Sequence, residues 1–115
     1  MVKRVIVGAH YGLGDWLAQR VTALVMAIYT LGFAALVVWQ APHGYEAWRA
    51  LFAPQWFRLA TFVMFLSLFW HAWIGVRDIL MDYIPATWLR LALQIIVLVL
   101  LVGYAGWAIQ ILWSV

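Results

Sequence analysis

The sequence predicts an all-α membrane protein with three transmembrane helices. Of its 115 residues, 69% are hydrophobic and only 10% are charged, whereas a soluble domain is about half apolar and a quarter charged. The charges leave 25 uncharged residues between Arg20 and Glu46, 18 between Arg58 and Arg77, and 25 after Arg90. A helix needs about 20 apolar residues to cross a bilayer, so each of these segments is long enough.

The three spans are expected near residues 18–40, 58–79 and 90–113, within one domain that covers residues 1–115. After the first span, turn residues lead into a short interfacial helix, expected over residues 47–52 and ended near Pro54. The second span should stop near or before Ile84, because a residue that precedes a proline avoids the helical region. The loops are too short for a soluble catalytic domain.

The basic residues predict the orientation of the chain. Five of them accompany the N-terminus and the second loop, and two accompany the first loop, so the positive-inside rule places the N-terminus in the cytoplasm and the C-terminus outside. The five are Lys3, Arg4, Arg20, Arg77 and Arg90, and the two are Arg49 and Arg58. An interfacial belt of aromatic residues is expected at both sets of helix ends, formed by Trp39, Tyr45, Trp48, Trp56 and Phe57 on the outside and by Trp16, Tyr83 and Trp88 on the inside.

Composition also excludes several functions. The chain has no cysteine, which removes disulfides, thiolate metal sites and iron–sulfur ligation. Its seven basic residues are scattered along the chain and form no basic patch, so we expect lipid contacts but no nucleic-acid partner.

One histidine, His71, lies within the second span. It is 12 residues past Leu59, roughly 18 Å along a helix, in the half of the membrane nearer the second loop. Helical spacing places it on a stripe of small or polar residues that should face protein, formed by Ala60, Met64, Ser67, His71, Gly75, Asp78 and Asp82. Two interpretations are open. His71 is either a neutral imidazole that hydrogen-bonds to a neighbouring helix, or an axial ligand of haem iron.

The haem interpretation requires a partner, because His10 belongs to the N-terminal segment and His43 to the outer loop. Arg20 ends a second stripe of small residues, with Ala23, Ala27, Thr30 and Ala34, on what should be another packing face. Its guanidinium could clamp a haem propionate or a lipid phosphate, or act as a positive-inside anchor.

The end of the second span carries the densest polar cluster of the chain, in which Arg77, Asp78, Asp82 and Tyr83 are expected to converge. A phenol at membrane depth can donate a hydrogen bond to a quinone carbonyl, and a neighbouring carboxylate can relay a proton. The alternative is an interfacial tyrosine beside a solvated acid.

With these residues in place, the chain resembles the D-type hydrophobic membrane anchor subunits of succinate dehydrogenase in bacterial complex II. The resemblance runs nearly end to end. It rests on Asp15-Trp-Leu-Ala-Gln-Arg20, Gly44-Tyr-Glu-Ala-Trp48, His71-Ala-Trp-Ile-Gly75 and Asp82-Tyr83, of which the last two are the specific part.

The resemblance implies half of a heterodimeric anchor bundle, paired with a C-type cytochrome b subunit and docked to an iron–sulfur subunit and a flavoprotein subunit at the bacterial inner membrane. It implies a shared haem b with His71 as ligand to the iron, Arg20 near its propionates, and Tyr83 and Asp82 at the ubiquinone site. The chain would then be a non-catalytic subunit in electron transport and the tricarboxylic acid cycle.

One departure from the family pattern concerns the N-terminal segment. Gly14 stands before Asp15 where the family carries a histidine, and the nearest histidine is His10. The alternatives to the leading interpretation are a fumarate reductase anchor that works with menaquinone, and a small membrane assembly or transport subunit without redox function.

Overall fold

A computed structural model describes the backbone of residues 2–115 and the side chains of residues 12–115. That part of the chain forms four helices: α1 (Val2–Gln40), α2 (Gly44–Leu51), α3 (Gln55–Tyr83) and α4 (Thr87–Leu112). Three segments are long and apolar enough to cross a membrane, namely Gly12–Gln40, Gln55–Tyr83 and Thr87–Leu112. The predicted fold class is therefore confirmed.

The predicted boundaries differ mainly at the N-terminus, because α1 continues back to Val2 instead of beginning near residue 18. Only glycine could have interrupted it there, at Gly8, Gly12 and Gly14, and glycine weakens a helix without stopping it. The short helix α2 begins at Gly44, three residues before the expected start, and ends at Leu51.

Proline and backbone conformation explain where the long helices end. Ala41 adopts the left-handed conformation, with φ of 45°, and its N–H donates to the carbonyl of Val37, which closes α1 just before Pro42. At the other end of the bundle, Ile84 is extended because Pro85 follows it, so α3 stops at Tyr83 as predicted. The guanidinium of Arg90 donates to the carbonyl of Ile84 at 3.3 Å and ties α4 to this turn.

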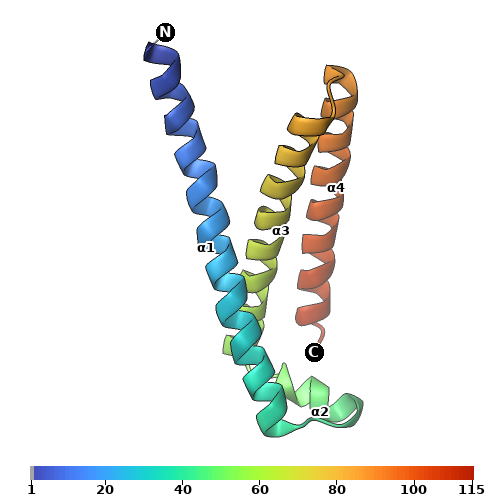
Figure 1. Ribbon diagram of the computed structural model, residues 1–115. Helices are drawn as coiled ribbons and strands as arrows, with labels where there is room; N and C mark the ends of the chain where they lie inside the picture. The colour runs from blue at the N-terminus through green and yellow to red at the C-terminus, as the bar shows by residue number, and fades with distance from the viewer. Residues whose placement is uncertain (1) are drawn as a thin grey trace.

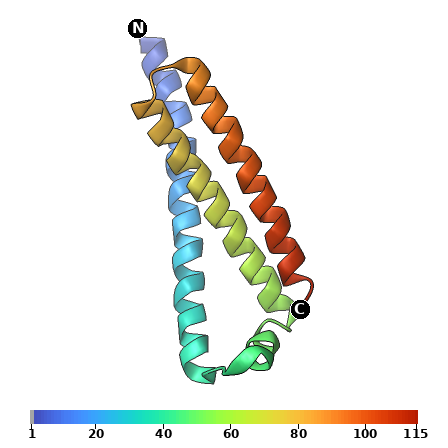
Figure 2. The same ribbon diagram turned by 90° about the vertical axis from the view of Figure 1, so that its right-hand side faces the viewer.

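The central helix is α3, which packs against α1 on one side and α4 on the other (Figure 1). Figure 2 shows α3 and α4 side by side along most of their length, and α2 lying across the end of the bundle opposite the N-terminus. In Figure 1 the N-terminal part of α1 diverges from α3. In Figure 2 the same two helices instead separate toward the α2 end, so α1 and α3 cross between their ends.

Aromatic rings fill the junction of α1, α2 and α3. Phe57 is only 5% exposed and stacks against Tyr29 and Phe33 at centroid distances of 6.2 and 6.3 Å. Phe52 lies 5.0 Å from Phe57, and Trp48 lies 6.4 Å from Phe33. Phe57, expected in the interfacial belt, is thus a core residue, because the α2 turn folds it back against α1.

Few other apolar side chains in the described part of the chain are buried; they are Leu51, Ile74, Ala108 and Leu112. Large residues such as Leu31, Val38 and Val102 are more than 70% exposed. A helix that is apolar on all sides needs lipid or another helix around it. Most of the apolar surface of this chain is therefore available for contact with lipid or a partner chain.

Candidate functional site

His71 lies on the face of α3 that meets α1, where it is half-buried. Its Nδ1 is 3.1 Å from Oγ1 of Thr22 on α1, and Thr22 is itself only 5% exposed. No hydrogen bond to the other ring nitrogen, Nε2, is formed by the side chains of residues 12–115. One nitrogen of His71 is thus held by the neighbouring helix, and the other has no partner in the described chain.

A cavity of about 570 Å³ opens beside His71, between the N-terminal half of α1 and the C-terminal half of α3. Its walls carry charged and amide side chains as well as apolar ones: Gly12, Asp15, Trp16, Gln19, Arg20, Ala23, His71, Ile74 and Asp78. The structure therefore brings together two of the predicted site residues, His71 and Arg20, from different helices.

Arg20 is held at this cavity by an aromatic ring. Its guanidinium carbon lies 4.7 Å above the centre of the Trp16 ring, a cation–π contact within one helix. The one salt bridge among the described side chains joins Arg77 to Asp15, so Arg20 has no carboxylate partner there. A cation in this position is able to bind an anionic group.

The salt bridge between Arg77 and Asp15 links α3 to α1 farther toward the N-terminus of α1. It corrects one expectation, since Arg77 was predicted to join Asp82 and Tyr83. Residues five positions apart on a helix point in different directions, and Arg77 turns toward α1 instead. Asp78, the neighbour of Arg77, lines the cavity.

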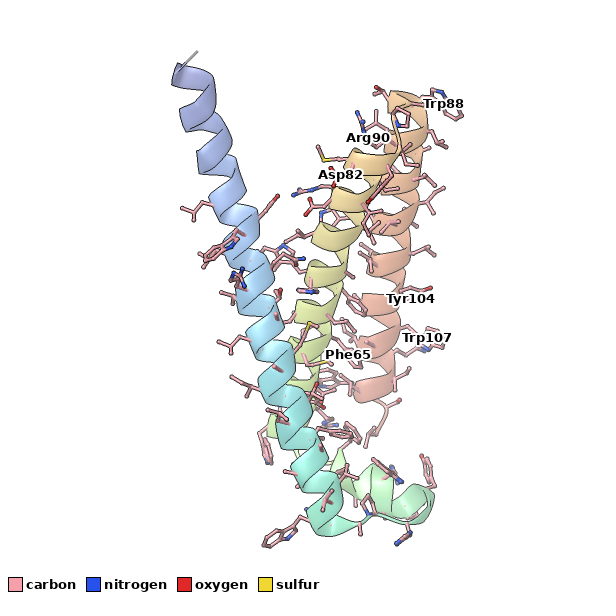
Figure 3. All side chains as sticks on the ribbon, in the orientation of Figure 1. Phe65, Asp82, Trp88, Arg90, Tyr104 and Trp107 are labelled. Carbon is pink, nitrogen blue, oxygen red and sulfur yellow. The ribbon has the colours of Figure 1, made fainter. Side chains whose placement is uncertain are left out.

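Tyr83 and Asp82 lie apart from the cavity, at the end of α3. Tyr83 is 76% exposed, and it is 12 residues from His71, roughly 18 Å along the helix. Figure 3 shows Asp82 at the same end of the bundle as Arg90 and Trp88. The chain thus presents two separate groups of predicted site residues.

Three contributors were missed from the sequence: Thr22, Trp16 and Gln19. Gln19 lines the cavity, and its Oε1 is buried without a hydrogen-bond partner in the described chain. Buried polar atoms are seldom left in this state, so a group from outside the chain is expected to complete the wall. The sequence did contain a signal for Thr22. Two antiparallel spans place the start of the first span, which contains Thr22, beside the later part of the second span, which contains His71.

The structure does not place the remaining predicted residues at the site. His43 is exposed in the turn between α1 and α2, at the opposite end of α1 from the cavity. His10 lies outside the residues whose side chains are described, while Gly14 is exposed. No group of three or more His, Asp or Glu side chains converges among residues 12–115, so a metal held here would take further ligands from elsewhere.

The stripes of small residues behave differently on the two helices. On α3, Ser67 is buried and His71 and Gly75 are half-buried, as expected for a face that meets protein, whereas Asp78 and Asp82 are exposed. On α1 the whole stripe is exposed, because larger residues such as Tyr29 and Phe33 make the contact with α3. The exposed residues are Arg20, Ala23, Ala27, Thr30 and Ala34.

Comparisons with known proteins agree with the resemblance found in the sequence. Residues 3–105 match the family described as succinate dehydrogenase/fumarate reductase transmembrane subunit. The chain is also 41% identical over 102 residues to a protein of Coxiella burnetii named succinate dehydrogenase hydrophobic membrane anchor subunit, and the match covers 89% of each chain. With its three apolar helices, the chain is a multi-pass membrane protein that belongs to the family of succinate dehydrogenase and fumarate reductase transmembrane subunits.

Proposed function

We propose that this chain is the hydrophobic membrane anchor subunit of a succinate:ubiquinone oxidoreductase in a bacterial inner membrane. In this role it binds haem b together with a C-type anchor subunit and supplies part of the ubiquinone site. Succinate is oxidised on the flavoprotein subunit, and electrons reach the membrane through the iron–sulfur subunit. The name and 41% identity of the Coxiella burnetii relative support the succinate dehydrogenase assignment over the fumarate reductase alternative.

The observation that carries the haem assignment is the state of His71. Its Nδ1 is engaged by Thr22, its Nε2 has no partner in the described chain, and the residue borders a cavity that also contains the unpaired cation Arg20. A haem would supply a one-electron carrier. His71 would hold its iron through Nε2, and Arg20 would neutralise a propionate.

The surroundings fit a group that is completed by a second chain. A side chain at Gly75, one turn from His71, would meet no atom within 4 Å, so this face of α3 has space beside it. The buried Oε1 of Gln19 belongs to a residue that lines the cavity, and the exposed stripe of small residues lies on the same helix, α1. Because the described chain brings one histidine to the cavity, any further protein ligand of the haem iron would come from the C-type subunit.

For the quinone, Tyr83 is the donor and Asp82 the neighbouring carboxylate. The phenol would donate a hydrogen bond to a quinone carbonyl oxygen, and Asp82 would orient it or accept a proton. The exposure of Tyr83 at the end of α3 suits a site that other subunits close. The basic residues favour the cytoplasmic side for this end, with the N-terminus inside and the C-terminus in the periplasm.

Purification of the tagged chain from its native membrane tests this proposal. We expect three partner subunits, one b-type haem per complex, and reduction of ubiquinone by succinate. The chain expressed alone should bind no stable haem. Purification of the chain alone as a monodisperse monomer with a full complement of bis-histidine haem would contradict the shared site, and faster turnover with menaquinone would favour the fumarate reductase alternative.

A further inference from the structure

We infer that Thr22 is a positioning residue for the haem ligand, one that selects the tautomer of His71 and strengthens it as an electron donor to iron. This inference rests on the proposed haem function and adds to it a residue that tunes the potential of the cofactor. It is carried by three atoms in a row: the carbonyl oxygen of Ala18, the hydroxyl of Thr22 and Nδ1 of His71.

The direction of the hydrogen bonds follows from the single proton of the threonine hydroxyl. Oγ1 of Thr22 lies 2.6 Å from the carbonyl oxygen of Ala18, which can only accept, so the hydroxyl proton points there. Toward His71, at 3.1 Å, the same oxygen can then only accept. Nδ1 therefore carries the ring proton, and Nε2 keeps the lone pair that binds a metal.

The same geometry makes Thr22 a better acceptor than an isolated hydroxyl. A hydroxyl that donates to a helix carbonyl becomes more negative at its oxygen, and this polarisation is strong where water is absent. Thr22 is buried, with 5% of its surface exposed. An acceptor at Nδ1–H strengthens electron donation from Nε2 to a bound metal and fixes the orientation of the ring, as partners of metal-bound histidines do. A stronger donor stabilises ferric over ferrous iron, so Thr22 would lower the haem potential.

A second threonine in the chain provides a matched control. Thr61 on α3 donates to the carbonyl of Phe57 at 2.9 Å and lies 2.6 Å from the phenol oxygen of Tyr29. It is as deeply buried as Thr22, at 4% exposed, and it joins the same two helices. Its partner, the phenol of Tyr29, has no nitrogen that could bind a metal, so loss of the Thr61 hydroxyl removes an equivalent contact without touching His71.

The test is a redox titration of the purified complex carrying Thr22→Val, Thr22→Ser or Thr61→Val, followed by optical and EPR spectroscopy of the haem. At the wild-type midpoint potential, the ratio of reduced to oxidised haem should be about 2- to 10-fold higher in Thr22→Val than in the wild type. This is the range expected for one lost hydrogen bond. Its low-spin EPR signal should shift or broaden. Thr22→Ser should restore the wild-type values, and Thr61→Val should keep them.

Two results separate failure of this inference from failure of the proposed function. If Thr22→Val carries full haem with wild-type potential and EPR signal, Thr22 has no positioning role, although the haem function stands. If the wild-type complex carries no haem, both fail. Should Thr22→Val not assemble, Thr22→Ala carries the same test, because it also lacks an acceptor and leaves more room; a wild-type potential in that variant overturns the inference.

Discussion

The two halves of the α1–α3 interface are joined by the same kind of contact but have different surroundings. In the polar half, beside the cavity that His71 and Arg20 line, Oγ1 of Thr22 lies 3.1 Å from Nδ1 of His71. In the aromatic half, beside Phe33 and Phe57, Oγ1 of Thr61 lies 2.6 Å from the phenol oxygen of Tyr29. Both threonines donate to a carbonyl four residues earlier in their own helix. The contact by itself therefore joins helices, and its neighbours decide whether it also serves a ligand.

The surroundings of the two contacts differ more in chemistry than in the volume of the cavity beside them. A cavity of about 570 Å³ lies beside His71 and is bordered by Asp15, Arg20 and Asp78. One of about 590 Å³ lies beside Tyr29 and is lined almost entirely by apolar side chains such as Phe33, Trp56 and Val63. Inside a membrane, charged groups are costly and seldom lack a function. The comparison teaches that the polar half has the chemistry that our proposed charged ligand requires, whereas the aromatic half has the chemistry of apolar packing.

The largest effect on stability is expected from Phe57→Ala, in the aromatic half. Phe57 is 5% exposed and contacts rings from α1 and from the α2 turn. Its loss should lower the free energy of unfolding by about 3 kcal/mol, the lower end of the range for buried phenylalanine, because lipid rather than water is the alternative environment. Thermal unfolding in detergent measures this. Trp39→Ala, at a site 88% exposed, should change little, and an equal loss there would contradict a packing role specific to the aromatic half.

The next effect is on turnover, from Tyr83→Phe at the far end of α3. Loss of one phenol-to-carbonyl hydrogen bond should cost about 0.5 to 1.5 kcal/mol, and more if charge develops on the quinone oxygen, so ubiquinone reduction should fall severalfold. Succinate oxidation by an artificial acceptor that draws electrons before the quinone should survive. The matched control is Tyr45→Phe, because Tyr45 is 75% exposed at the opposite end of the bundle. Wild-type ubiquinone turnover in Tyr83→Phe would end this assignment.

A smaller effect is expected from the ion pair that closes the polar half. Asp15 and Arg77 are 48% and 28% exposed, and partly exposed pairs contribute about 0.5 to 1 kcal/mol or less. A double-mutant cycle of Asp15→Asn and Arg77→Gln, followed by thermal unfolding, should give a coupling energy of that size that shrinks in high salt. Purely additive effects of the two substitutions would mean that the pair does not hold the helices together.

The smallest effect concerns the contact between Tyr29 and Thr61. Hydrogen bonds between membrane helices average about 0.6 kcal/mol, so a cycle of Tyr29→Phe and Thr61→Val should give a coupling of this order. Optical spectra of the complex should be the same for all members of the cycle. A shifted haem spectrum in these variants would remove the functional distinction between the two halves.

Much of the fold was predictable because the charges mark its limits. The gaps after Arg20, Arg58 and Arg90 located the three spans, and Pro85 located the end of α3. The helical start of α1 was not predictable from charge, since the N-terminal segment is polar enough to lie outside a membrane and still continues the helix. Phe57 was placed in the belt because a sequence does not show how the α2 turn folds back on α1.

The candidate site was predictable only in part, because a sequence does not show how α1 packs against α3. His71 and Arg20 could be singled out one by one, as a histidine within a span and a cation at its end, but their meeting at one cavity depends on the register of α1 against α3. The partner of Arg77 depends on that register too. Antiparallel spans bring the region of Thr22 near that of His71, but only the structure shows that Oγ1 of Thr22 lies 3.1 Å from Nδ1 of His71.

The most direct test of the account compares the haem spectrum of the complex carrying His71→Ala with that of His43→Ala. The two substitutions are chemically identical, but His71 borders the cavity in the polar half and His43 is exposed at the opposite end of α1. We expect His71→Ala to lose or strongly perturb the low-spin b-type optical and EPR signals while the chain still inserts into the membrane, and His43→Ala to keep the wild-type signals. Unchanged spectra in His71→Ala would contradict the account and leave His71 as a histidine that serves only to hydrogen-bond α3 to α1.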